Sequence, residues 1–202
     1  MNESAVSKTI YISNSERNKD LWKNPTRFVS SDEKYSPSEI VEWARVVMGS
    51  IDCDPCSVEI VNRRIVKAEK YYTLSNDGLL DENPWHGNIW MNPPWSRKCR
   101  LFIQKLFREL DRGNVSQYCV LMPMNFISRT SVQLCMWSKI SLIHVYSLDR
   151  RDAISFSNPD GSLSQGYGLL TMGMFLGGPD LRQHKFNIPP VGNWARIEMS
   201  VT

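Results

Sequence analysis

The amino-acid sequence predicts an α/β domain built on a mostly parallel sheet flanked by helices. Apolar runs of strand length alternate along the chain with amphipathic runs of helix length, which is the order of elements that parallel sheets require. The chain has 202 residues, of which 42% are hydrophobic, and this suits one domain with a sizeable core. Two expected strands end in unusual polar sequences, and in such sheets ligands bind beyond the carboxyl ends of the strands.

The composition favours a cytoplasmic protein. The formal net charge of +3 permits a polyanionic partner without demanding one. No apolar run approaches the length of a membrane span, and the N-terminus starts no signal-peptide pattern. Five cysteines are an odd number without the spacing of a disulfide scaffold, which favours a reducing compartment.

The first firm element is a helix that follows a polar N-terminal arm over 1–34, and we expect the folded domain over 35–202. Ser36-Pro37-Ser38-Glu39 has the pattern of a capping box with Ser36 as the N-cap. Gly49 is expected to end the helix. The apolar residues that share one face are Ile40, Val41, Ala44, Val47 and Met48.

The later elements are predicted from the same periods and stop signals. Gly87–Met91 predicts a buried strand that ends at Asn92, and 98–112 predicts a helix that Gly113 ends. Its inward residues would be Leu101, Ile103, Leu106, Phe107 and Leu110. Mixed signals leave 62–72 unassigned. The other expected elements are strands over 9–12, 50–55, 117–122, 140–146 and 168–176, a turn over 76–79 and a helix over 131–139.

The tetrapeptide Asn92-Pro93-Pro94-Trp95 is the most specific signal in the sequence. Its prolines fix the backbone and remove two N–H donors, so the Asn92 side-chain carbonyl and the Pro93 carbonyl can accept both hydrogens of one amino group. An aryl amine held in this way can direct its lone pair at a methyl donor, while a base stacks on Trp95. A duplex base would have to flip out to reach this pocket. A structural turn closed by a core tryptophan is the alternative, and the preceding strand and the acidic turn upstream disfavour it.

Further motifs stand in order around the tetrapeptide. They are Tyr35-Ser36-Pro37, Ile51-Asp52-Cys53-Asp54-Pro55-Cys56-Ser57, Asn62, Ala68, Tyr71-Tyr72-Thr73, Asp77-Gly78-Leu79, Trp85-His86-Gly87, Trp90 and Val120-Leu121-Met122-Pro123. Over residues 33–178 this string resembles the phage-type DNA N6-adenine methyltransferases, the Dam family of phages and prophages.

The resemblance implies a Rossmann-like class I methyltransferase fold, S-adenosylmethionine as methyl donor and double-stranded DNA as partner, in a bacterial or phage-infected cytoplasm. The activity it implies is site-specific adenine-N6 methylation, as in restriction–modification. Asn92, Pro93, Pro94 and Trp95 would hold the flipped adenine. Tyr35, Ser36 and Pro37 would line the methionine end of the cofactor. The other cofactor-binding residues would be Asp52, Asp54, Cys56, Ser57, Asn62 and Asp77.

The sequence departs from the family pattern at two places. Trp95 stands where the family usually has Tyr or Phe, and Cys56 stands where a small Ala is common. The acidic turn also lacks the glycines of a pyrophosphate-binding loop. S-adenosylmethionine carries a positive sulfonium and ammonium and no phosphate, so a carboxylate at Asp52 or Asp54 suits it.

Basic residues supply the candidate DNA contacts. Arg97, Lys98 and Arg100 directly follow the tetrapeptide, and Arg150 and Arg151 precede a polar loop over 155–165 that could reach a groove. A solvated helix face is the alternative for the first group, which continues with Lys105, Arg108 and Arg112.

A C-x-x-C pattern at Cys53 and Cys56 permits a zinc or redox interpretation. No second pair or histidine follows at ligand spacing, so no metal is expected. Two other functions stay open at this level. The same tetrapeptide could methylate cytosine N4 or a protein glutamine, or the chain could be a DNA-binding module that has lost its cofactor.

Overall fold

The computed structural model describes residues 34–126, 142–146, 156–158, 162, 172–181 and 194–198. The elements in chain order are α2 (Ser38–Met48), β1 (Cys53–Asp54), α3 (Glu59–Val61), the π-helix η1 (Asn62–Val66), β2 (Lys70–Tyr71), β3 (Gly87–Met91), α4 (Cys99–Asp111), β4 (Val115–Pro123), the 3-10 turn η2 (Met124–Phe126), β5 (Leu142–Tyr146), β6 (Met172–Gly177) and β7 (Trp194–Glu198). The expected arm over 1–34, with its strand over 9–12, and the expected helix over 131–139 lie outside the described residues, apart from Lys34.

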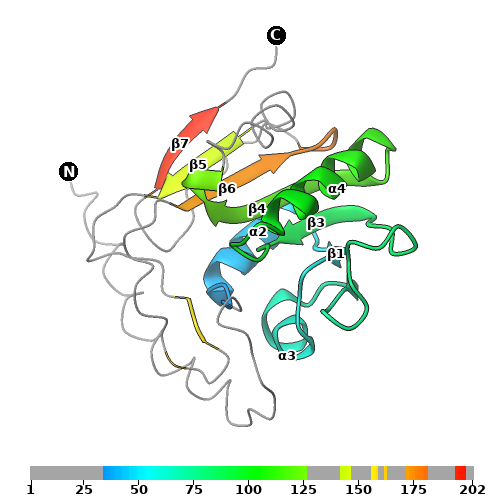
Figure 1. Ribbon diagram of the computed structural model, residues 1–202. Helices are drawn as coiled ribbons and strands as arrows, with labels where there is room; N and C mark the ends of the chain where they lie inside the picture. Colours follow the sequence, from blue (N-terminus) through cyan, green and yellow to red (C-terminus); the bar gives the residue numbers. More distant parts are fainter. Residues whose placement is uncertain are drawn as a thin grey trace, which may run out of the picture.

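The strands form one seven-stranded sheet in the order β2-β1-β3-β4-β6-β5-β7 (Figure 1). The pairs β2–β1, β1–β3 and β3–β4 are parallel. The pairs β4–β6, β6–β5 and β5–β7 are antiparallel, so β1 to β5 share one direction and only β6 and β7 oppose it. This confirms the predicted α/β class and its mostly parallel sheet.

The direction in which strands are added to the sheet reverses between β1 and β3. The chain places β2 on one side of β1 and then returns to place β3 on the other side. Such a reversal is a topological switch point, where open α/β sheets bind ligands beyond the carboxyl ends of their strands. Asp54 and Met91 are the last residues of these two parallel strands. The acidic turn and the tetrapeptide that follow them therefore emerge at the same edge of the sheet.

The core lies on the two faces of the sheet, because successive side chains of a strand point to opposite faces. On one face, α2 packs with residues such as Trp90, Leu121 and Met174. On the other face, α4 packs with the alternate residues of the same strands, among them Ile89, Met91, Val120 and Phe175.

The first helix begins later than the sequence predicts. Pro37 is its N-cap and Ser38 its first residue, and no side-chain hydrogen bond caps the helix. The predicted capping box with Ser36 as N-cap is therefore wrong, because the Ser36 hydroxyl accepts a hydrogen bond from Asn92 instead. Gly49 ends the helix in the left-handed conformation (φ 85°), as predicted.

The helix α4 agrees with its prediction to within one residue at each end, but its inward face is partly wrong. Leu101 is 43% exposed, whereas Phe102 is buried. Lys105 is also buried, which the basic pattern did not indicate. Its ammonium donates hydrogen bonds to the carbonyls of Gly78 (2.9 Å), Leu80 (2.5 Å) and Asn83 (2.8 Å).

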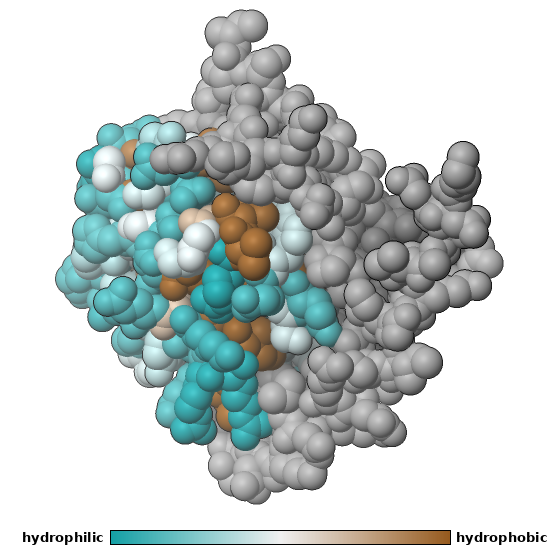
Figure 2. Space-filling view, turned by 180° about the vertical axis from the view of Figure 1, so that it is seen from behind, coloured by the Kyte–Doolittle hydropathy of each residue, from teal (hydrophilic) through white to brown (hydrophobic). Residues whose placement is uncertain are grey.

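Hydrophilic residues cover most of the described surface on the side opposite that of Figure 1, with apolar residues near the middle of the view (Figure 2). Among the described residues, the large hydrophobic side chains that are exposed are Val46, Leu74, Leu80 and Leu101. Among the helices that the structure describes, none is both long and apolar enough to cross a membrane.

Candidate active site

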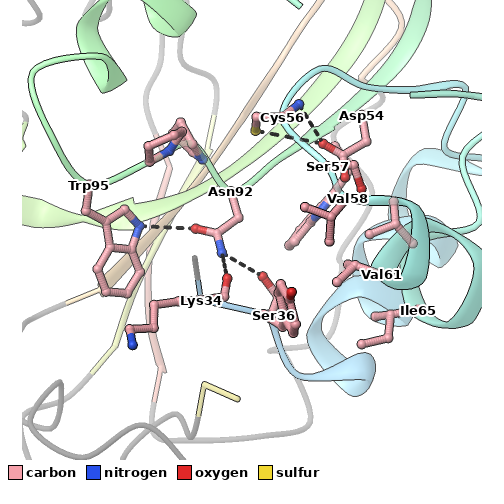
Figure 3. Close-up of a pocket in the computed structure, with 15 residues that line it drawn as sticks. Lys34, Ser36, Asp54, Cys56, Ser57, Val58, Val61, Ile65, Asn92 and Trp95 are labelled. Atoms are coloured by element: carbon pink, nitrogen blue, oxygen red, sulfur yellow. Dashed lines mark hydrogen bonds between the residues drawn. The ribbon is translucent and has the colours of Figure 1, made fainter. Parts of the chain in front are cut away.

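A cavity opens at the switch point and is lined by four segments of the chain. These are 34–36 before α2, the turn 54–58 after β1, residues of α3 and η1, and 90–95 around the end of β3. Figure 3 shows Asn92 in the middle, between Trp95 on one side and the acidic turn on the other. The two polar sequences that were predicted to carry function thus line the same cavity.

The Asn92 carboxamide is held by three hydrogen bonds. Its Nδ2 donates to the backbone carbonyl of Lys34 (3.0 Å) and to the hydroxyl of Ser36 (3.1 Å). Its Oδ1 accepts from the indole Nε1 of Trp95 (3.1 Å). A carbonyl oxygen has two lone pairs, so one acceptor position on Oδ1 is left for another donor.

Trp95 packs against Phe156, a residue that the sequence analysis did not identify as functional. The two rings make an edge contact, with centroids 4.9 Å apart and planes at 89°. Phe156 is 1% exposed, and the neighbouring Ser157 exchanges two backbone hydrogen bonds with Tyr35 (3.0 and 3.1 Å). The start of the loop predicted to reach DNA therefore packs against two residues that line the cavity, Trp95 and Tyr35. Its aromatic residue within a polar stretch was the only signal.

The acidic turn buries a carboxyl group at Asp54, which is 3% exposed. Burial raises the pKa of Asp54 from 3.8 to about 6, and the backbone N–H of Cys56, 3.2 Å from Oδ1, opposes the shift. No cationic side chain of the described residues pairs with this carboxyl. The nearby Ser57 hydroxyl also lowers the pKa of Asp54. This hydroxyl is buried, and its geometry makes no hydrogen bond to any described residue.

Cys56 packs where the two strand ends meet. Its thiol lies 3.8 Å from Oδ1 of Asp54. Burial raises the pKa of Cys56 well above its ordinary value, and the backbone N–H of Asn92 opposes the shift. Burial also raises the thiol pKa of Cys53 and Cys119. Cys53 and Cys119 are buried and Cys56 is half-buried, and thiols with a raised pKa suit packing rather than redox chemistry. No metal-ligating cluster occurs in the part of the chain that the structure describes.

Asp52 and Asp77, which were expected at the cofactor, do not line the cavity. The Asp52 carboxylate accepts from the backbone N–H of Asn88 (2.8 Å) and from the Ser50 hydroxyl (2.7 Å), at the starts of β1 and β3. Asp77 has a positive φ of 25° and accepts from the N–H of Leu79 (3.0 Å), so it shapes an exposed turn.

Pro37 and Asn62 are also absent from the cavity lining. Asn62 is buried and binds the backbone of Ala68 twice, donating to its carbonyl (3.1 Å) and accepting from its N–H (2.9 Å). These bonds join two residues of the segment 62–72, to which the sequence assigned no element. Of the predicted cofactor residues, the structure brings together Tyr35, Ser36, Asp54, Cys56 and Ser57.

The basic residues after the tetrapeptide divide into two groups. Arg97, Lys98 and Arg100 are exposed, and none of them takes part in a salt bridge within the described ranges. Further along, Arg108 pairs with Asp81 (2.8 Å) and Arg112 pairs with Glu109 (2.9 Å). Arg150 and Arg151 lie outside the described residues.

The cavity combines acceptors, an aromatic face and an apolar wall. The acceptors are Asn92 Oδ1, which still has one free lone pair beside the bond from Trp95, and the Pro93 carbonyl, which accepts no hydrogen bond from a described residue. The apolar wall is formed by Val58, Val61 and Ile65 (Figure 3).

No family model matches this chain, and no curated protein matches its sequence.

Proposed function

We propose that the protein is an S-adenosylmethionine-dependent DNA methyltransferase that methylates the exocyclic N6 of a flipped adenine. The observation that carries this proposal is the meeting of the Asp54 turn and the Asn92 tetrapeptide in one cavity at the switch point. The first offers a buried carboxyl to a cationic donor, and the second offers paired acceptors to an amine. Adenine as the acceptor base follows the resemblance of the surrounding motifs, as does the assignment to the Rossmann-like class I methyltransferases.

The acidic half of the cavity fits this cofactor on two counts. Asp54 has no cationic partner among the described side chains, and a bound ammonium or sulfonium would supply one. The unpartnered Ser57 hydroxyl is a second group that a polar ligand would satisfy. Tyr35 and Ser36 line the same space. When bound, the cofactor supplies an electrophilic methyl group on sulfur.

The tetrapeptide half holds the nucleophile. Asn92 Oδ1 and the Pro93 carbonyl accept the two N–H bonds of the amine, and Trp95 stacks on the base. Held by these two acceptors, the nitrogen would present its lone pair to the methyl group that the cofactor would supply, and the methylated amine would lose its proton to water. No general base is required, so the rate depends on positioning and electrostatics.

DNA would approach across the exposed residues Arg97, Lys98 and Arg100, which directly follow the tetrapeptide. Contacts of this kind neutralise phosphates and set the register of the duplex without reading its sequence. They would lie beside the base that enters the cavity.

The test uses the purified full chain, labelled S-adenosylmethionine and unmethylated genomic DNA, followed by digestion to nucleosides. We expect labelled N6-methyladenine from the wild type and none from Asn92→Ala. The variant should still bind S-adenosylmethionine in a calorimetric titration. Label found only in N4-methylcytosine would move the acceptor to cytosine, which the same carbonyls could hold. Absence of cofactor binding by the wild type would replace the proposal with a non-catalytic DNA-binding module.

A further inference from the structure

The orientation of the Asn92 carboxamide is determined by partners of fixed polarity. The backbone carbonyl of Lys34 can only accept a hydrogen bond, and the indole Nε1 of Trp95 can only donate one. The amide nitrogen therefore faces Lys34 (3.0 Å) and the oxygen faces Trp95 (3.1 Å). Exchanging the two ends of the amide would break both bonds at once.

This orientation decides what the tetrapeptide can offer to a ligand. Both hydrogens of Asn92 Nδ2 are used, one by Lys34 and one by the Ser36 hydroxyl (3.1 Å). Pro93 and Pro94 have no N–H. Of the Asn92 side chain and the two prolines, the groups left for a ligand are one lone pair of Asn92 Oδ1 and the Pro93 carbonyl, and both are acceptors. A ring amine satisfies them, whereas a ring carbonyl would place oxygen against oxygen.

Packing holds the indole of Trp95 where its N–H can reach Asn92. Phe156, itself buried, meets the Trp95 ring edge-on at 4.9 Å. One side of the indole is thereby supported by protein. A phenylalanine at position 95 would keep an aromatic face but would lose the donor to Asn92.

We propose that Trp95, through its indole N–H, and Ser36, through its hydroxyl, are positioning residues that lock Asn92 as an acceptor and make the site selective for an amino group. This role of Trp95 is additional to stacking on the base. The inference rests on the proposed function for its effect on catalysis, but the lock itself is a property of the protein without ligand.

The functional arm compares Trp95→Phe and Ser36→Ala with the wild type. A freely rotating Asn92 amide spends time with its nitrogen toward the amine, so we expect each variant to lower kcat about tenfold or more. The KM for DNA should change little in Trp95→Phe, because the stacking face remains. Ser38→Ala and Trp43→Phe are the matched controls, since neither residue lines the cavity. Thermal unfolding checks that every variant is folded.

The structural arm needs no activity. In protein labelled with ¹⁵N-tryptophan, the Trp95 indole N–H resonance, assigned by its loss in Trp95→Phe, should exchange slowly with solvent. Asn92→Ala should shift that resonance and speed its exchange, while the other indole resonances stay in place.

The outcomes separate the claim that Asn92 is held in one orientation from the proposed methyltransferase function. The proposed positioning of Asn92 would be overturned if the Trp95 indole resonance did not change in Asn92→Ala. It would also be overturned if Trp95→Phe had the wild-type kcat or a higher one. Failure of the wild type to methylate any DNA would overturn the proposed function, and the resonance experiment would then decide the lock alone.

Discussion

Asp54 is a buried carboxyl that lowers the stability of the protein without a ligand. Its pKa is raised by burial from 3.8 to about 6. An acid with a raised pKa contributes stability that is fully present below its unfolded pKa and is lost as the pH rises through the folded value. At neutral pH the ionised group therefore opposes folding until a cation binds beside it. This property supports the proposal that Asp54 lies in a binding site.

Asp54→Asn is expected to raise the free energy of unfolding at pH 8 and to weaken S-adenosylmethionine binding. The amide keeps an acceptor for the Cys56 N–H while removing the buried charge. The gain is at most roughly 3 kcal/mol, from about 1.4 kcal/mol per pKa unit, and it should vanish near pH 3, below the unfolded pKa. Urea denaturation at both pH values measures it. The exposed Asp81→Asn is the control, and a gain independent of pH would contradict this account of Asp54.

At the scale of an element, α4 carries both a structural cation and the start of a basic surface. Lys105 is 2% exposed, lies 5.3 Å over the ring of Trp85 and binds three backbone carbonyls of the segment 78–83. Burial lowers its pKa. Through Lys105, α4 thus holds the irregular segment 78–83 in place.

Lys105→Met should destabilise the fold by about 3–5 kcal/mol, because it leaves buried carbonyls without a donor. Chemical denaturation measures the loss, with the exposed Arg100→Met on the same helix as the control. A loss below about 1 kcal/mol would mean that water replaces the ammonium, since an unmade buried hydrogen bond costs more than that.

The exposed residues Arg97, Lys98 and Arg100 are expected to bind phosphates of the DNA backbone. Replacing all three by Ala should weaken DNA binding similarly for every sequence, while cofactor binding stays unchanged. The slope of log K against log salt should fall by about 0.9 for each phosphate that the variant no longer neutralises. Arg108→Ala, which breaks the pair with Asp81, is the control. A variant with an unchanged salt slope would place the DNA elsewhere.

For the whole molecule, the cavity joins segments that are far apart in the chain. Residues 34–36 and the ends of β1 and β3 meet there, and Phe156 packs against Trp95 of the lining. A ligand that binds only the folded state stabilises all of them together, by about 2.7 kcal/mol at a hundredfold excess over its Kd. Thermal unfolding should therefore move upward with S-adenosylmethionine for the wild type and Asn92→Ala but not for Asp54→Asn. A shift that survives in Asp54→Asn would remove that carboxyl from the cofactor site.

Local patterns predicted the elements well where periodicity and a stop signal agree. The strand β3 has its predicted bounds, and α4 and the end of α2 at Gly49 were predicted to within a residue. Such signals depend only on neighbours in the chain. The meeting of the acidic turn with Asn92 also follows from the sheet rule for strand ends.

The features that the sequence did not reveal depend on the folded surroundings of each residue. Ser36 matches a cap, but its hydroxyl binds Asn92, 56 positions away. Lys105 has the sequence neighbours of a solvated face, yet its partners lie 22 to 27 positions earlier. Asp52, Asn62 and Asp77 stand in motif positions but serve the backbone around them. The spacing of residue types along the chain does not indicate which hydrogen-bond partner each of these side chains takes.

The central claim is tested most directly by reading modified bases in the DNA of cells that express the protein. The account predicts N6-methyladenine at a defined sequence with the wild type and its absence with Asn92→Ala expressed to the same level. Methylation that persists in Asn92→Ala, or DNA without any modified adenine in cells that contain the folded wild type, would contradict it.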